Sequence, residues 1–362
     1  MMSSSPHIRS KESTRRIMAD VIIALLPAVA WGTYYFGPRV LLVALVTVAS
    51  CVISEFICEK IMKRDITIGD LSAVVTGVLL ALNLPPAIPL WIAAIGGIIA
   101  IVLIKQIFGG IGQNFMNPAL GARVILLLSW TQHMTNWTNP RMPAAADTVS
   151  NATQVADAVS TATQIADVAY SVSSVADAVS SATSVADAVS SATPLIYAKT
   201  GQDVLGGVAR PEYLDLFLGR VLGSIGEISV LVLLIGAAYL LIRKVITLSI
   251  PLSYIGTVAL LTWILGGDKP FTGDFLYHIL AGSLILGAFF MATDYSTSPV
   301  MEKGRIIMGI GCGIITVVIR LYSNYPEGVS FAIILMNLLV PLIDKFTIPR
   351  AFGGESRIER HN

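Results

Sequence analysis

The sequence has little charge and little cysteine. Of its 362 residues, 13% are Asp, Glu, Lys or Arg, against about 25% in a typical soluble domain, so an ordinary soluble domain is excluded. The formal net charge of +1 gives no reason to expect a nucleic-acid partner or a basic peripheral membrane anchor. The three cysteines, Cys51, Cys58 and Cys312, belong to no CxxC or Cys/His cluster, which argues against an iron–sulfur or zinc centre in this chain.

Long apolar runs take up most of the chain, which is 54% hydrophobic. A helix of about 20 apolar residues crosses the hydrocarbon core of a bilayer, which is about 30 Å thick. By this length, the runs predict an all-α polytopic membrane protein with ten transmembrane helices. The expected spans are 17–36, 39–58, 70–84, 88–105, 115–131, 218–242, 246–266, 274–293, 304–323 and 328–344.

Lys and Arg gather at alternate ends of these spans, and such residues mark the cytoplasmic side. Both termini are therefore expected in the cytoplasm, and the long segment between the fifth and sixth spans on the outside. The resulting parts are a cytoplasmic N-terminal segment (1–16), a first five-helix half (17–131), an extracytoplasmic loop (132–216), a second five-helix half (217–344) and a cytoplasmic tail (345–362).

The two halves resemble each other. "IGDLSAVVTGVLLAL" (68–82) and "TGDFLYHILAGSLIL" (272–286) both place Gly-Asp at the start of a span, and "FMNPAL" (115–120) is echoed by "LMNLLVP" (335–341). Because five spans lie on each side of an external loop, the second half enters the membrane from the opposite side. The pattern predicts two inverted five-helix repeats, which place ion or substrate sites at the repeat interface.

The stretch "FGGIGQNFMNPALGARV" (108–124) is the densest polar patch within the apolar runs. Its glycines permit a non-helical approach to a ligand, and its amides offer donors and acceptors. It is a candidate flavin or ion site at the cytoplasmic end, and the alternative is a Gly-rich turn whose amides cap the fifth span. The candidate residues are Gly109, Gly110, Gln113, Asn114 and Asn117.

Acidic and hydroxyl side chains near the ends of spans are candidates for an ion pathway, because polar groups inside a membrane are costly when unpaired. Oxygen ligands of this kind suit a hard cation such as sodium. The candidates are Asp70, Glu227, Asp274, Asp294 and Thr297. For the last two, an ordinary helix cap is the alternative; for Glu227 it is an ion pair with Arg220 or Arg123.

A small polar unit, D-x-x-S-x-A-T, recurs in the long loop with a ten-residue period. Its copies are 147–153, 157–163, 177–183 and 187–193, with a degenerate copy between the second and third. The period fits neither 3.5 nor 3.6 residues per turn, so a coiled coil is not expected. Composition alone predicts a disordered, low-complexity segment.

The unit resembles the acceptor motif of the flavin transferase that couples FMN through its phosphate to a threonine hydroxyl. "DAVSSATPL" (187–195) is similar to the flavin segment of the RnfD/NqrB family, which is found in the Rnf complex and in the sodium-pumping NADH:quinone reductase. Other stretches with this resemblance are "SPHIRS", "DLSAVVTGVLLALNLPP", "GQNFMNPALGAR", "GSIGEISVL", "MATDYSTSP" and "PEGVSFAIILMNLLVPLID". The overall length and the short N-terminal extension are more similar to the member found in the Rnf complex.

The resemblance implies a covalent FMN on Thr193, with Asp187, Ser190 and Ala192 as the other motif residues. It also implies a subunit of an ion-translocating ferredoxin:NAD oxidoreductase in the bacterial cytoplasmic membrane, not catalytic alone and coupled to sodium or protons. Expected partners are iron–sulfur subunits, a second covalent-flavin subunit, the flavin transferase and the lipid bilayer. A second, non-covalent flavin (riboflavin or FMN) is expected in the 109–117 patch.

Three alternatives remain open. Flavin could be attached upstream, at Thr153, Thr163 or Thr183. Within the redox class, the chain could be the family member of the sodium-pumping NADH:quinone reductase. In a different class, ten spans and an inverted repeat would suit a solute channel or transporter, and the ten-residue units would then be a spacer.

Overall fold

The computed structural model of the chain describes residues 13–137, 194–200, 204–205, 208–227, 229–267, 269–323 and 327–347. Thr193, the motif residues Asp187, Ser190 and Ala192, and the upstream copies of the ten-residue unit lie outside the described residues.

Helices joined by short turns make up the first part of the chain. Ser13 begins the first helix by accepting a hydrogen bond from the Arg16 amide, and Gly37, with φ 100°, ends it. The paired prolines Pro85 and Pro86 separate the third and fourth helices. The elements are α1 (Thr14–Phe36), α2 (Arg39–Ile61), η1 (Ile68–Asp70), α3 (Ser72–Leu82), α4 (Leu90–Ile99), the π-helix η2 (Ala100–Gln106), α5 (Pro118–Ser129) and α6 (Thr131–Met134).

The second part is also helical and is more often interrupted. Its elements are α9 (Pro194–Thr200), β1 (Val204–Leu205), β2 (Val208–Ala209), α10 (Tyr213–Leu218), α11 (Val230–Ile242), α12 (Ser249–Leu265), α13 (Phe275–Leu280), α14 (Leu284–Leu286), the π-helix η3 (Gly287–Met291), α15 (Glu302–Tyr322) and α16 (Val329–Thr347). The all-α prediction is confirmed, with β1 and β2 adding a short antiparallel pair.

Four helices among the described residues are long and apolar enough to cross a membrane: α1, α2, α15 and α16. Shorter apolar helices accompany them, at Ser72–Leu82, Leu90–Gln106, Pro118–Ser129, Val230–Ile242 and Ser249–Leu265. Large apolar side chains also cover the outside, such as Leu45 (65% exposed) and Ile53 (57%) on α2. Such a surface is typical of contact with lipid, and the chain is a polytopic membrane protein; the number of ten spans stays a prediction.

The sixth expected span, 218–242, is not one helix. α10 ends before Gly219 (φ 90°), and α11 begins only at Val230. In between, the amides of Ile225 and Gly226 donate to the carbonyls of Leu84 (3.1 Å) and Leu82 (2.6 Å) at the end of α3. The segment stays non-helical because its polar backbone is satisfied by the other half of the molecule.

The eighth expected span, 274–293, is broken as well. α13 ends at Leu280, and Gly282 adopts φ 76°, a backbone conformation that side chains rarely allow. The buried Arg320 of α15 donates to the carbonyls of His278 (2.5 Å) and Ala281 (3.3 Å), which the break leaves without helical partners. Arg320 therefore stabilises the interruption.

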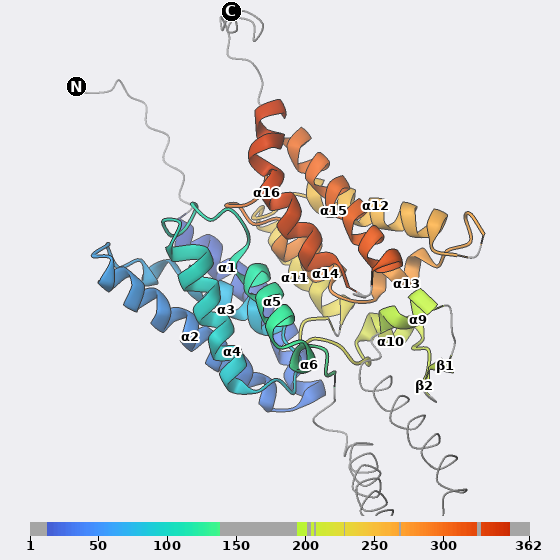
Figure 1. Ribbon diagram of the computed structural model, residues 1–362, viewed down its shortest axis with the longest axis horizontal. Helices are drawn as coiled ribbons and strands as arrows, with labels where there is room; N and C mark the ends of the chain where they lie inside the picture. The colour runs from blue at the N-terminus through green and yellow to red at the C-terminus, as the bar shows by residue number, and fades with distance from the viewer. Residues whose placement is uncertain are drawn as a thin grey trace, which may run out of the picture.

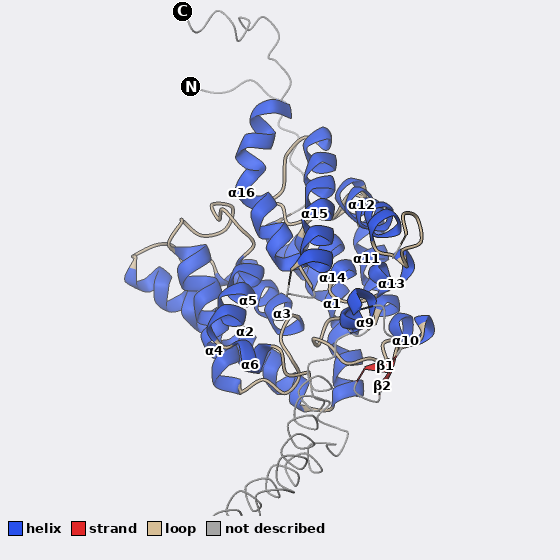
Figure 2. Ribbon diagram, turned by 45° about the vertical axis from the view of Figure 1, so that its right-hand side comes forward, coloured by secondary structure: helices blue, strands red, loops and turns tan. Residues whose placement is uncertain are grey.

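The two halves show corresponding contacts. α2 packs against α3 and α4, and α12 packs against α13 and α15. Across the halves, α1 packs against α11 and α5 against α16, and Figures 1 and 2 show α1–α5 and α11–α16 as neighbouring groups. One apolar core runs through both groups, with Leu80 and Leu120 buried in the same cluster as Leu240 and Leu286. The two inverted repeats stay a prediction.

Candidate functional site

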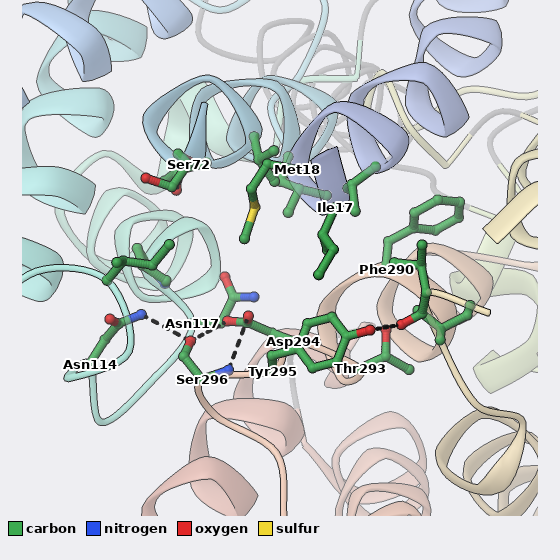
Figure 3. A pocket seen from close by; sticks show the side chains of 18 of the residues that line it. Ile17, Met18, Ser72, Asn114, Asn117, Phe290, Thr293, Asp294, Tyr295 and Ser296 are labelled. Carbon is green, nitrogen blue, oxygen red and sulfur yellow. Dashed lines mark hydrogen bonds between the residues drawn. The ribbon is translucent and has the colours of Figure 1, made fainter. Parts of the chain in front are cut away.

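A cavity of about 80 Å³ lies between the two halves, room for several water molecules at ~10–15 Å³ each. Both halves line it: α1, α3, η2 and the start of α5 from the first, and α11, η3 and residues 293–296 from the second (Figure 3). Much of its wall is apolar, including Ile17, Val21, Leu79, Leu240, Phe289 and Phe290. A largely apolar pocket with a few polar groups is the usual form of a small-molecule site.

Asn114 lines this cavity and carries an unsatisfied polar atom. The side chain is only 8% exposed, and its Nδ2 donates to the Ser296 hydroxyl at 3.3 Å (Figure 3). Its Oδ1 is buried without a hydrogen-bond partner among the described residues. Buried carbonyl oxygens are normally paired, so this oxygen lacks a partner that the described residues do not supply.

Asn117 has a different role. Its Oδ1 accepts from the amides of Ala119 (3.0 Å) and Leu120 (3.3 Å), and its Nδ2 donates to the carbonyl of Met291 at 3.4 Å. It therefore caps α5, with Pro118 in the first helical turn. The structure thus shows Asn117 as a helix cap, and the residue also lines the cavity.

The glycines of the same patch form the turn that leads to Asn114. Gly109 and Gly110 both have positive φ, 126° and 96°, a conformation that favours glycine. Gln113 is exposed. These three residues do not line the cavity, so of the five candidate residues in the patch the structure brings the two asparagines to it.

Asp294 faces the same cavity from the second half. Its carboxylate accepts from the hydroxyls of Ser296 (3.0 Å) and Thr297 (3.4 Å). The two ion-pathway candidates Asp294 and Thr297 are thus brought together, in a local turn that also presents Asp294 to the cavity.

Lys105 is a cavity residue that the sequence pattern marks only as a basic end of the fourth span. It is 2% exposed, and its Nζ lies 2.5 Å from both Glu55 Oε1 and Ser72 Oγ. Ser72 in turn donates to Asp70 Oδ1 at 2.6 Å, so the candidate Asp70 reaches the cavity wall only through Ser72 and Lys105. Glu55, an isolated acid in the second apolar run, was the signal that a buried cation had to lie nearby.

Glu227 lies in a separate centre, where the halves meet. Arg123 Nη2 lies 3.3 Å from Glu227 Oε1 and also pairs with Glu327. Arg123 Nη1 donates to Asn83 Oδ1 (3.1 Å) and Ser330 Oγ (2.8 Å). Of the two partners expected for Glu227, the structure shows Arg123.

Asp274, the last ion candidate, begins α13. It accepts from the Tyr277 amide at 3.0 Å and from the Tyr213 hydroxyl at 2.7 Å, and it pairs with Arg210. The hydrogen bond to Asp274 is the main reason why the pKa of Tyr213 is raised above its ordinary value. Asp274 thus ties the 210–213 segment to the helical body, away from the residues that line the cavity.

Within the described ranges, no group of three or more His, Cys, Asp or Glu side chains is arranged to hold a metal ion. The carboxylates of the two sites are engaged by hydroxyl, ammonium or guanidinium groups instead.

Comparison with known proteins identifies relatives over almost the whole chain. The "NQR2, RnfD, RnfE family" matches residues 1–353. The chain is 45% identical to the D subunit of the Na(+)-translocating ferredoxin:NAD(+) oxidoreductase complex of Acetobacterium woodii, over 97% of this chain and 95% of the relative. It is 41% identical to the D subunit of the proton-translocating ferredoxin:NAD(+) oxidoreductase complex of Clostridium ljungdahlii, over 97% and 96%. With the family match covering nearly every residue, the chain belongs to the NQR2, RnfD, RnfE family.

Proposed function

We propose that this chain is the flavin-carrying RnfD membrane subunit of an Rnf-type ion-translocating ferredoxin:NAD oxidoreductase. The observation that carries the proposal is the near full-length similarity to relatives named as that subunit, at 45% and 41% identity. The chain passes electrons and contributes to the ion pathway, while iron–sulfur subunits and a second covalent-flavin subunit handle the soluble substrates. The membrane is the bacterial cytoplasmic membrane, with ten spans and both termini in the cytoplasm.

The covalent flavin is FMN, attached through its phosphate to Thr193 in "DAVSSATPL". The residue that follows, Pro194, is buried. Leu195 packs into an apolar cluster with Leu216 and Tyr277. A flavin attached at Thr193 would therefore be held one residue from the folded body, which limits the distance that it can move from its electron partners.

The second flavin, riboflavin or FMN, binds without a covalent bond in the cavity between the halves. The wall chemistry suits such a ring: the walls are apolar, and the unpartnered Asn114 Oδ1 could accept from the N3–H of an isoalloxazine. The cavity of about 80 Å³ would have to widen to admit it. The flavin would supply reversible one- or two-electron transfer. The protein would supply orientation, through Asn114, and exclusion of water, through the apolar walls.

Asp294 and Thr297 are the ion-pathway candidates that fit best, because Asp294 accepts from hydroxyl and amide groups and is paired with no cation among the described residues. Glu227 is held by Arg123 and is better suited to holding the halves together. The names of the relatives at 45% and 41% identity differ in the translocated ion, which is sodium in the first and the proton in the second. The transported ion is therefore a matter for measurement, by the sodium dependence of ferredoxin:NAD activity in vesicles.

Fluorescence of the denatured chain tests the proposal. Co-expression with the flavin transferase is expected to give a fluorescent band at the size of this chain in a denaturing gel, and expression without the transferase none. A solute channel or transporter, in which the ten-residue units are only a spacer, would give no band in either case, and that result would overturn the redox function.

A further inference from the structure

Lys105 places a buried positive charge at the wall of the cavity. Among the described residues that line the cavity, two carry an ammonium or a carboxyl group. They are Lys105 from the first half and Asp294 from the second. A ligand in this cavity therefore lies between a cation and an anion that belong to different halves.

Lys105 has one more N–H donor than it has protein acceptors among the described residues. An ammonium group has three N–H donors, and within the described residues Lys105 donates to two acceptors, Glu55 Oε1 and Ser72 Oγ, each at 2.5 Å. The third N–H has no protein acceptor in that part of the chain, although the side chain is 2% exposed and borders the cavity. An acceptor atom of a ligand would complete the set.

The hydrogen bonds of Glu55, the partner of Lys105, are incomplete for an ion pair whose role is only structural. Glu55 uses a single oxygen, Oε1, for both Lys105 and the Gln106 amide (3.1 Å), while its Oε2 has no partner among the described residues. Buried ion pairs add little net stability even when fully satisfied. The arrangement instead holds the ammonium in place at the edge of a cavity.

The backbone that carries Lys105 is unusual. Lys105 lies in the π-helix η2, and Phe289 and Phe290 lie in the π-helix η3. Both π-helices line the same cavity. Such wide turns are uncommon and occur frequently at functional sites, because they change the direction in which side chains leave the helix.

We propose that Lys105 is a positioning and charge-tuning residue for a planar heteroaromatic electron acceptor in this cavity, and that its third N–H donates to an acceptor atom of that ligand. The inference rests on the proposed second flavin and extends it to a residue of this chain. Asn114 Oδ1 would take the donor of the ligand and Lys105 one of its acceptors, so the two residues fix its orientation.

The expected consequence is electrostatic. Reduction adds negative charge to the ring system, and a fixed ammonium within hydrogen-bond distance stabilises that charge most strongly where water is excluded. Lys105 should therefore make the bound flavin easier to reduce. No proton or electron passes to or from Lys105 in this role.

The test uses the purified complex with two variants of this chain. The double variant Lys105→Met/Glu55→Gln removes the cation together with its buried partner, so that no carboxylate is left unpaired. The single variant Glu55→Gln retains Lys105 and removes the opposing charge. The readouts are the content of acid-extractable flavin and the midpoint potential of that flavin, with the covalent flavin as an internal reference.

In the double variant we expect the affinity for reduced flavin, relative to oxidised flavin, to fall at least tenfold. This corresponds to a midpoint potential lower by about 30 mV for a two-electron couple. Loss of the extractable flavin from an assembled complex would equally support the role of Lys105. Glu55→Gln should shift the potential in the opposite direction.

An unchanged potential in both variants would overturn the inference, and absence of extractable flavin from the wild-type complex would instead overturn the proposed second flavin. If the double variant does not assemble, an unchanged potential in Glu55→Gln alone overturns the inference, because the Lys105–Glu55 pair would then lie too far from the flavin to act on it.

Discussion

Arg123 of α5 and Glu227, in the turn before α11, form an ion pair between the two halves, with Nη2 3.3 Å from Oε1 and side-chain exposures of 6% and 5%. The same guanidinium pairs with Glu327, which precedes α16. The second nearby cation is Arg320, whose Nε donates to the Glu327 carbonyl at 3.2 Å. One arginine thus joins three segments that are far apart in the sequence.

Removing this arginine should be more harmful than removing one of its partners. Arg123→Met leaves the buried Glu227 and the partly buried Glu327 without their cation, which costs about 3–5 kcal/mol by comparison with other broken buried pairs. Glu227→Gln should cost less, because Glu327 still pairs with Arg123. Thermal unfolding in detergent micelles measures both. Equal, small decreases in Tm would show that the centre does not hold the halves together.

The family and the helical class could be predicted from the sequence, because they depend on local patterns. Apolar runs of about 20 residues indicate membrane helices, and "DAVSSATPL" is specific enough to point to one family. The pairing of Glu227 with Arg123 was among the alternatives, since a buried acid needs a cation. Local composition could not choose between Arg123 and Arg220.

The interruptions and the cavity wall could not be predicted in the same way. Residues 219–227 continue an apolar run that fits a helix, and their non-helical path depends on carbonyls of Leu82 and Leu84 more than a hundred residues away. Lys105 was interpreted only as a marker of the cytoplasmic side, because its partner Glu55 is 50 residues away. Gly282 gave a local signal, but glycine is frequent in membrane helices.

Asn114 and Gln113 provide a matched pair for the non-covalent flavin. Asn114→Leu removes the unpartnered amide oxygen that is proposed to accept from the flavin. An unpaired buried donor costs about 1–3 kcal/mol, so the affinity for riboflavin should fall roughly ten- to a hundredfold. Gln113→Leu changes an exposed neighbour that does not line the cavity and should leave the flavin content unchanged. Acid extraction and quantification of flavin from the purified complex distinguishes the two. Equal flavin content in both variants would place the second flavin elsewhere.

Tyr213 should make the attachment of the 210–213 segment sensitive to alkaline pH. Its hydroxyl donates to Asp274 at 2.7 Å, and its pKa is raised mainly by that bond. A group with a raised pKa in the folded state contributes stability below its unfolded pKa, about 10 for tyrosine, and loses that contribution as the pH rises through the folded pKa. Protease cleavage near residues 204–213 should therefore increase above about pH 10 in the wild type. Tyr213→Phe lacks the titrating hydroxyl and should show no such step; a step of the same size in this variant would assign the effect to another group.

The threonines of the repeated unit can be separated by single substitutions, because each copy of D-x-x-S-x-A-T has the same residues around its threonine. Only the copy that ends at Thr193 continues into Pro194 and Leu195, which are buried in the folded body. Thr193→Val, which removes the hydroxyl and keeps the shape, is expected to abolish in-gel flavin fluorescence after co-expression with the transferase. Thr183→Val is the matched control, in the preceding copy, and should retain the full signal. If fluorescence persisted in Thr193→Val and fell in Thr183→Val, the attachment site would lie upstream, and the flavin would not be held next to the buried Pro194.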